Sequence, residues 1–223
     1  MTLRERVKLY TTKTAIKGAL RVLPKISDER WLSLVKGRVY RLKKREERDF
    51  LENLLVNLKK TASKMAPKVR EKIVMNRINN AMVQGQPKRM AFAKKYGFNP
   101  PNLLVMSPTM RCNLKCFGCY AWQYSKKKDL PYDVCNRVIK EANDIGIYFF
   151  VITGGEPFCW DHLYDFLERH NDSFFQIYTN GQLIDDKVAK KLAELGNAIP
   201  CISVEGFQKE TEARRGKDSW SNI

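Results

Sequence analysis

Two patterns of hydrophobic residues divide the chain near residue 100. In the first part, apolar residues recur at steps of three and four, which predicts amphipathic helices. They stand at Leu3, Val7, Tyr10, Ile16, Leu20 and Leu23, at Trp31, Leu34, Val35 and Val39, at Phe50, Leu54, Leu55 and Leu58, and at Val69, Ile73, Ile78 and Met82. Gln84-Gly85-Gln86-Pro87 is expected to end the last of these helices, and Asn99-Pro100-Pro101 marks a boundary. We therefore predict a helical N-terminal region over residues 1–100.

After Pro101, short apolar runs alternate with helical segments. Strands are expected to start near residues 103, 147, 174 and 199, with helices over about 131–145, 163–167 and 185–195 between them. Strands that alternate with helices predict a parallel α/β sheet. Polar and small residues follow the end of each of these strands. That edge of a parallel sheet is where ligands bind.

Composition limits the class of protein and its location. A chain of 223 residues can hold one sizeable core with an appendage, or two small domains. No apolar run approaches the roughly 20 residues of a membrane-spanning helix, and the first residues lack the apolar core of a signal peptide. We therefore expect a cytoplasmic protein with reduced thiols.

The positive charge is concentrated in the predicted helical region. Residues 1–100 hold 26 Lys and Arg against 8 Asp and Glu, a net charge of +18, whereas residues 101–223 hold 15 and 16, a net charge of −1. Such asymmetry indicates an anionic partner, either a membrane surface, to which the protein would bind peripherally, or nucleic acid, RNA in particular. The alternative is a solvated basic surface, or one that packs against an acidic partner.

Cys112, Cys116 and Cys119 form a C-x₃-C-x₂-C motif with no fourth cysteine nearby. A closed structural site for zinc or for an iron–sulfur cluster uses four protein ligands. Three thiolates on a four-iron cluster leave one iron open to another ligand. Of the other cysteines, Cys135 and Cys201 are expected to be buried small hydrophobic residues.

A second motif, Gly154-Gly155-Glu156-Pro157, follows the second predicted strand. Together the two motifs resemble those of the radical S-adenosylmethionine (radical SAM) superfamily, and the resemblance covers about residues 102–223. It implies a partial parallel barrel of six βα units, of which four are present here. The expected domains are therefore a basic helical region over 1–100 and a radical SAM core, truncated at its C-terminus, over 101–223.

The resemblance also implies cofactors and site residues. Cys112, Cys116 and Cys119 would bind a [4Fe-4S] cluster, and SAM would bind the remaining iron. A one-electron donor such as ferredoxin or flavodoxin would reduce the cluster, which cleaves SAM to a 5′-deoxyadenosyl radical that takes hydrogen from a substrate. Gly154, Gly155, Glu156 and Pro157 are expected to contact the amino group of SAM. Phe117 or Tyr120, which flank Gly118 and Cys119, would supply the ring that contacts the adenine, since Gly118 has none. Asn180, Ser203 and Glu205 would contact the ribose and the carboxylate. Arg111 and Lys115 are expected to keep the thiolates ionised.

The substrate is left open between three classes. Cys119-Tyr120-Ala121 resembles the branches that mature peptides or cofactors, and the basic N-terminal region suits either lipid or RNA modification. An alternative of a different kind is a non-catalytic metal-binding module, in which Cys159 or Cys201 would close a zinc or iron–sulfur site.

Overall fold

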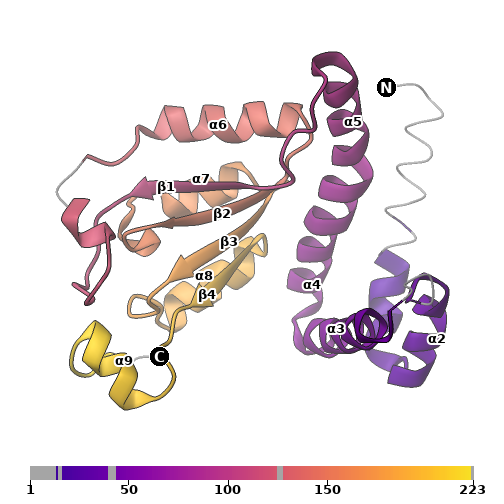
Figure 1. Ribbon diagram of the computed structural model, residues 1–223, viewed down its shortest axis with the longest axis horizontal. Helices are drawn as coiled ribbons and strands as arrows, with labels where there is room; N and C mark the ends of the chain where they lie inside the picture. The colour runs from indigo at the N-terminus through magenta and orange to yellow at the C-terminus, as the bar shows by residue number, and fades with distance from the viewer. Residues whose placement is uncertain (1–13, 15–16, 40–43, 125–127, 222–223) are drawn as a thin grey trace. The chain divides into compact units, whose positions relative to one another are not determined.

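The computed structural model describes residues 14, 17–39, 44–124 and 128–221. The chain forms two compact units, Met1–Glu71 and Lys72–Ile223, which we describe separately (Figure 1). Of the first predicted helix, Leu3, Val7, Tyr10 and Ile16 lie outside the described residues. Residues 17–22 are helical, and Pro24 lies in the short 3₁₀ turn Leu23–Lys25 that follows.

The first unit contains the helices α2 (Asp28–Val39) and α3 (Arg45–Lys64). The indole N–H of Trp31 donates a hydrogen bond to the carbonyl of Leu55 at 3.1 Å. The ammonium group of Lys59, which is buried, pairs with the Asp28 carboxylate at 2.6 Å. These two contacts join the helices, and they confirm the helical N-terminal region.

A longer helical stretch crosses into the second unit. It comprises α4 (Pro67–Val74), the π-helical segment Met75–Gln84 and α5 (Gly85–Tyr96). The helix break expected at residues 84–87 is therefore wrong: Pro87 lies in the first turn of α5, where proline is tolerated. Gly85 is there for packing, since a Cβ would lie 2.4 Å from the carbonyl oxygen of Gly146.

The residues after Lys72 belong to the same compact unit as the sheet. The side-chain amide of Asn76 donates to the carbonyls of Asn171 and Ser173, both at 3.0 Å. Lys88 bonds the carbonyl of Asn143 at 2.8 Å. The compact unit thus starts before residue 100, and the division of function between residues 1–100 and 101–223 stays a prediction.

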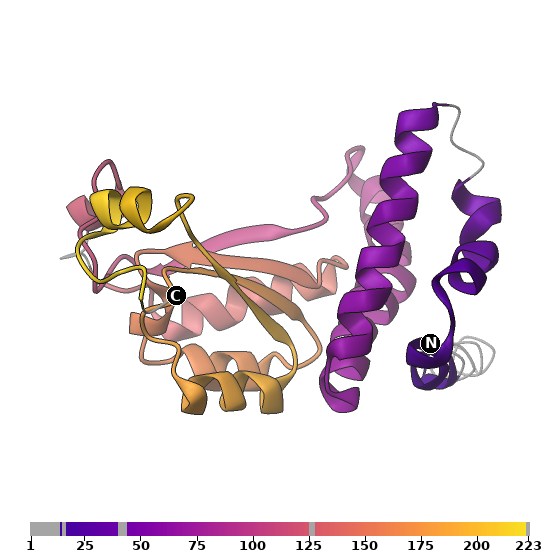
Figure 2. The same cartoon turned by 90° about the horizontal axis from the view of Figure 1, so that it is seen from below.

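The described residues of the second unit form one parallel sheet in the order β1-β2-β3-β4. Its strands are β1 (Leu104–Thr109), β2 (Phe149–Gly154), β3 (Phe174–Thr179) and β4 (Ala198–Ile202). The intervening helices α6 (Tyr132–Asp144), α7 (Leu163–Arg169) and α8 (Asp186–Leu195) cover one face of the sheet (Figure 2). The predicted α/β class and the four βα units are confirmed.

The core lies between the sheet and these three helices. Alternate strand residues, among them Phe150, Ile152, Phe175 and Ile177, are fully buried there against α6, α7 and α8. On the opposite face, Val105 is 60% exposed and Tyr178 is 45% exposed. Helices on one face only, with an accessible second face, are the arrangement of a partial barrel.

The last helix, α9 (Gln208–Arg215), lies at the carboxyl ends of the strands, on the same side as the loop that follows β1 (Figure 1). No helix in the described part of the chain has the length and apolarity needed to cross a membrane.

Candidate functional site

The two sequence motifs meet at the carboxyl edge of the sheet. The backbone N–H of Gly155 donates to the carbonyl of Thr109 at 3.0 Å, and that of Glu156 donates to the carbonyl of Arg111 at 2.8 Å. A Cβ on Gly155 would lie 2.2 Å from the Arg111 oxygen, so the two backbones are as close as glycine permits. The start of the cysteine loop is thereby fixed against the end of β2.

The three cysteines of the loop are half-buried and not in disulfides. The N–H of Cys119 donates to the carbonyl of Cys116 at 3.1 Å, which closes the turn that contains both. Burial raises the pKa of the Cys112 and Cys116 thiols, and Arg215 opposes that rise at Cys116. Within the described residues, no group of three or more His, Cys, Asp or Glu side chains is placed to hold a single metal ion.

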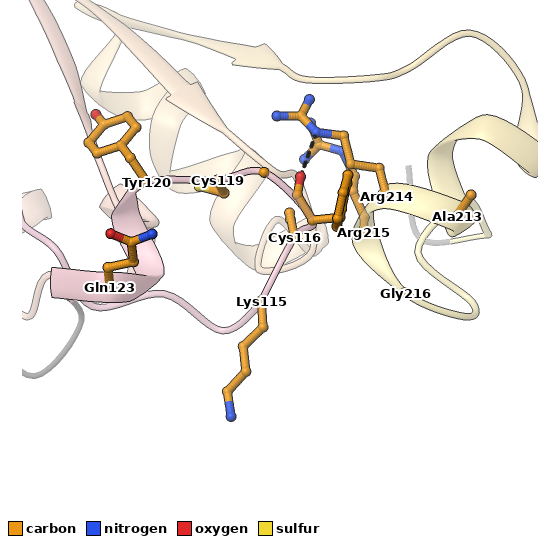
Figure 3. Close-up of a pocket in the computed structure, with 11 residues that line it drawn as sticks. Lys115, Cys116, Cys119, Tyr120, Gln123, Ala213, Arg214, Arg215 and Gly216 are labelled. Atoms are coloured by element: carbon orange, nitrogen blue, oxygen red, sulfur yellow. Dashed lines mark hydrogen bonds between the residues drawn. The ribbon is translucent and has the colours of Figure 1, made fainter.

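A cavity of about 830 Å³ lies between the cysteine loop and α9 (Figure 3). Its lining includes Cys116, Cys119 and both predicted aromatic residues, Phe117 and Tyr120. Phe117 is 83% exposed and Tyr120 is 59% exposed. Gly118 between them has a φ of +71°, a conformation that an aromatic residue rarely adopts, which accounts for the glycine at that position.

Two arginines of α9 complete the cavity, and sequence reasoning missed both. Arg214 joins α9 to the loop, because its carbonyl accepts the N–H of Phe117 at 2.8 Å and its Nε donates to the Phe117 carbonyl at 3.3 Å. Arg214 and Arg215 both pair with the carboxylate of Glu205. Arg215 is nearly buried, with 8% of its side chain exposed.

These arginines, rather than the residues expected, are the cations near the thiols. Arg111 is engaged elsewhere, with Asp129 at 2.8 Å and Asp161 at 3.0 Å. The side chain of Lys115 extends away from Cys116 and Cys119 (Figure 3). In the sequence, the only signal of these ion pairs is that Glu205 precedes Arg214 and Arg215 by nine and ten residues. Charged residues at such positions are equally typical of an exposed helix surface.

Glu156 is fully buried and links two strand ends. Its carboxylate accepts hydrogen bonds from the Thr179 hydroxyl at 2.7 Å, from the Asn180 N–H at 2.8 Å and from the Phe158 N–H at 3.2 Å. Pro157, also buried, begins the short turn after β2. The second motif is therefore hydrogen-bonded to the end of β3 as well as to the start of the cysteine loop.

The remaining predicted residues lie along the same edge. Asn180 follows β3 and is buried, with its amide nitrogen 3.9 Å from the Cys112 sulfur. The N–H of Ser203 donates to the carbonyl of Thr179 at 2.9 Å, which places Ser203 beside the end of β3, where Asn180 follows. Gly154 is the last residue of β2, and a Cβ on it would lie 2.2 Å from the carbonyl oxygen of Thr109.

The other cysteines differ from one another in burial. Cys135 is fully buried in the core, as expected, whereas Cys201 on β4 is only half-buried. Cys159 is half-buried near Glu156 and Arg111, and burial raises the pKa of its thiol.

The ion pair between Glu205 and Arg215 gives a prediction about pH. Its hydrogen bond to Arg215 lowers the pKa of Glu205 below the ordinary 4.5. The stabilisation is therefore present above pH 4.5 and is lost as the pH falls through the lowered value. We expect Glu205→Gln to destabilise the protein at pH 7 by about 2–3 kcal/mol, since it leaves a buried guanidinium without its carboxylate.

The measurement is chemical denaturation between pH 7 and pH 3. The difference in unfolding free energy between the two proteins should shrink as the pH falls, because protonation removes the same charge from the wild type. Glu210→Gln, which changes an exposed carboxylate in the first turn of α9, is the matched control. A Glu205→Gln difference that stays constant with pH would contradict the assignment.

Comparison with known proteins agrees with this geometry. The family model of the radical SAM superfamily matches residues 106–223. The chain is 30% identical over 118 residues to the Fe-coproporphyrin III synthase of Methanosarcina barkeri, covering 51% of this chain and 30% of that protein. It is 34% identical over 117 residues to the GTP 3′,8-cyclase of Aliarcobacter butzleri, covering 48% and 36%.

A solved structure shows the same arrangement of the chain. The structure of Streptococcus suis SuiB bound to precursor peptide SuiA superposes with a TM-score of 0.50 at 25% identity, over 69% of this chain and 33% of SuiB. The chain thus spans about a third of the length of these relatives. Since the family model covers the whole motif-bearing part of the sheet, the chain belongs to the radical SAM superfamily.

Proposed function

We propose that the protein generates a 5′-deoxyadenosyl radical, with Cys112, Cys116 and Cys119 as ligands of three irons of a [4Fe-4S] cluster. The family uses this cluster together with SAM. The observation that carries the proposal is the meeting of the cysteine loop with the glycine motif through the Glu156 N–H and the Arg111 carbonyl, 2.8 Å apart. When bound and reduced, the cluster supplies the electron that cleaves SAM.

The residues present fit these cofactors. Three half-buried thiols on one tight loop can direct their sulfurs to a single compact cluster. The cavity beside two of them carries Arg214 and Arg215, whose charge suits an anionic cluster and the carboxylate of SAM. No described thiol of this loop is used in a disulfide, so each is available as a thiolate ligand.

Each remaining residue has a proposed task. Gly154 and Gly155 let the backbone approach the amino group of SAM, and Glu156 and Pro157 hold that segment in place. Phe117 and Tyr120, at the cavity, offer a ring to the adenine. Asn180, Ser203 and Glu205, at the ends of β3 and β4, face the ribose and carboxylate, with Glu205 acting through the arginines it binds.

The substrate is an unidentified molecule that loses a hydrogen atom to the radical. By their names, one relative synthesises Fe-coproporphyrin III and another cyclises GTP, and SuiB is bound to its precursor peptide SuiA. These favour peptide or cofactor maturation as the class to test first. A one-electron donor such as ferredoxin or flavodoxin supplies the electron, and a cytoplasmic location stays a prediction.

The test is production of 5′-deoxyadenosine. The protein is reconstituted anaerobically with iron and sulfide, reduced with dithionite, and incubated with SAM, alone and with candidate peptides. A [4Fe-4S] absorption band together with 5′-deoxyadenosine in the chromatogram supports the proposal over a non-catalytic metal-binding module. A four-thiolate zinc site in X-ray absorption spectra would exclude it.

For the basic N-terminal region we propose an anionic membrane surface as the partner. Phe50, Leu54 and Leu58 of α3 are 69%, 40% and 55% exposed, and their four-residue spacing puts them on one face of the helix. The unit Met1–Glu71 that carries this stripe has 20 Lys and Arg against 8 Asp and Glu. An apolar helix face on a basic unit is the pattern of interfacial membrane binding, whereas RNA binding needs the charge but not the aliphatic stripe.

Leu54→Glu tests the stripe. We expect at least a tenfold loss of binding to vesicles that contain phosphatidylglycerol, since the change removes about 1.5–3 kcal/mol of apolar burial and adds a repelled charge. Asn53→Glu adds the same charge at an exposed neighbour without removing apolar surface, and should cost only a few fold. The measurement is sedimentation with vesicles at two salt concentrations. Equal losses of vesicle binding in the two variants would favour RNA as the partner instead. The same would follow if both variants retained binding to tRNA.

A further inference from the structure

The side chain of Asn180 is held in one orientation next to a proposed cluster ligand. Asn180 is 7% exposed, and its backbone N–H donates to the Glu156 carboxylate at 2.8 Å. Its side-chain Oδ1 accepts the N–H of Gln182 at 2.9 Å. Its Nδ2 lies 2.8 Å from Oδ1 of Asn113 and 3.9 Å from Sγ of Cys112.

This network fixes which end of the amide faces the sulfur. A backbone N–H, here that of Gln182, can only donate, so the atom that it meets must be the carbonyl oxygen of Asn180. The NH₂ group therefore points the other way, with one hydrogen for Asn113 and the other for the Cys112 sulfur. The same sulfur accepts the N–H of Leu114 at 3.5 Å.

We propose that Asn180 is a positioning residue that raises the reduction potential of the cluster by donating a hydrogen bond to the sulfur of Cys112. The inference rests on the proposed function, because it requires Cys112 to be a cluster ligand. Reduction adds a negative charge that is shared with the ligand sulfurs, so a donor to one of them stabilises the reduced state more than the oxidised state. The Asn180 donor itself is buried, so water screens it little.

The geometry gives Asn180 this role independently of the SAM contact proposed for it above. Its backbone is tied to Glu156 in the second motif, and its side chain reaches the first cysteine of the first motif. Asn180 thus connects the ends of β2 and β3 to the cysteine loop. A change in its amide group alters the environment of one sulfur while the backbone tie remains.

The experiment is an EPR-monitored redox titration of the reconstituted protein without SAM. For Asn180→Ala we expect the ratio of reduced to oxidised cluster at a fixed potential to fall about threefold to tenfold, the upper value corresponding to about 59 mV for one electron. Asn180→Asp keeps an oxygen for Gln182 but replaces the donor with a charged acceptor, and should lower the potential further. Asn113→Ala removes the other acceptor of the Asn180 amide. The amide can still donate to the Cys112 sulfur, so the potential should not fall.

A second readout reports on the hydrogen bond directly. Electron–nuclear double resonance of the reduced wild-type cluster, compared between H₂O and ²H₂O, should show an exchangeable proton of Asn180 beside that of Leu114 at the Cys112 sulfur, and the Asn180 signal should be absent in both Asn180 variants. A wild-type spectrum with only the Leu114 proton, or a potential that falls equally in Asn113→Ala, would overturn the inference. A wild-type protein that binds no [4Fe-4S] cluster would overturn the proposed function and the inference with it, whereas an unchanged potential in a cluster-loaded variant overturns the inference alone.

Discussion

Cys116→Ala should abolish the formation of 5′-deoxyadenosine. Cys116 lines the cavity, and in the sequence it stands between the other two cysteines of the motif. Its loss leaves a four-iron cluster with only two protein ligands. Loss of a residue that only supports a metal ligand costs about 10–100-fold, so loss of the ligand itself should reduce activity by more than about 100-fold. Iron and sulfide per chain, and the visible absorption of the cluster, should fall with it.

The control for this change is Cys135→Ala. Cys135 is fully buried in α6, among core residues and away from the cysteine loop. Its replacement removes one thiol of the same chemistry and should cost some stability but leave iron, sulfide and 5′-deoxyadenosine formation close to wild type. If Cys116→Ala retained a full cluster and Cys135→Ala lost it, the metal ligands would have been assigned to the wrong cysteines.

The position of the two motifs could be predicted from the sequence because both follow strands. Period and composition placed strands before Cys112 and before Gly154, and the ends of neighbouring parallel strands meet at one edge of a sheet. The structure confirms this at atomic detail, with Gly155 and Glu156 bonded to the carbonyls of Thr109 and Arg111. The strand ends at Asn180 and Ser203 follow from the same rule.

Contacts that depend on tertiary packing could not be predicted in this way. Arg215 looks like an exposed residue at the end of a polar helix, and only the return of α9 to the cysteine loop turns it toward Cys116. Glu156 illustrates the same limit, since the motif indicates its place but not that its carboxylate is buried and already holds Thr179 and Asn180. The sequence predicts a helix break at Gly85, because it does not show that the Gly146 carbonyl packs against this residue.

These features indicate how one chain builds a site from distant segments. The carboxylate of Glu156 joins β2 to β3, Asn180 joins β3 to the cysteine loop, and Arg214 joins α9 to the same loop. The loop therefore meets the end of β3 and α9 through these polar groups, and it meets the end of β2 through the Glu156 N–H, which donates to the Arg111 carbonyl. A cofactor held by a short loop requires such support, because a small displacement of one ligand is enough to lose the metal.

Gly155→Ala tests the closest of these joins. Its Cβ would lie 2.2 Å from the Arg111 oxygen and 2.5 Å from the Met110 oxygen, both backbone atoms that cannot turn aside. The clash must separate β2 from the cysteine loop and break the hydrogen bonds that Gly155 and Glu156 donate. We expect a loss of about 3 kcal/mol or more, a fall in melting temperature of about 10 °C and at least a tenfold weaker binding of SAM.

Gly118→Ala is the matched control on the same loop, because it separates crowding from backbone conformation. A Cβ on Gly118 meets nothing within 4 Å, but its φ of +71° disfavours alanine by about 1–2 kcal/mol. Its melting temperature should therefore fall by about half as much as that of Gly155→Ala or less. Calorimetry of both apoproteins, followed by titration of the reconstituted proteins with SAM, makes the comparison. Equal effects would mean that the loop is sensitive to any added methyl group, and that the close approach of Gly155 to Arg111 has no special part in holding the site.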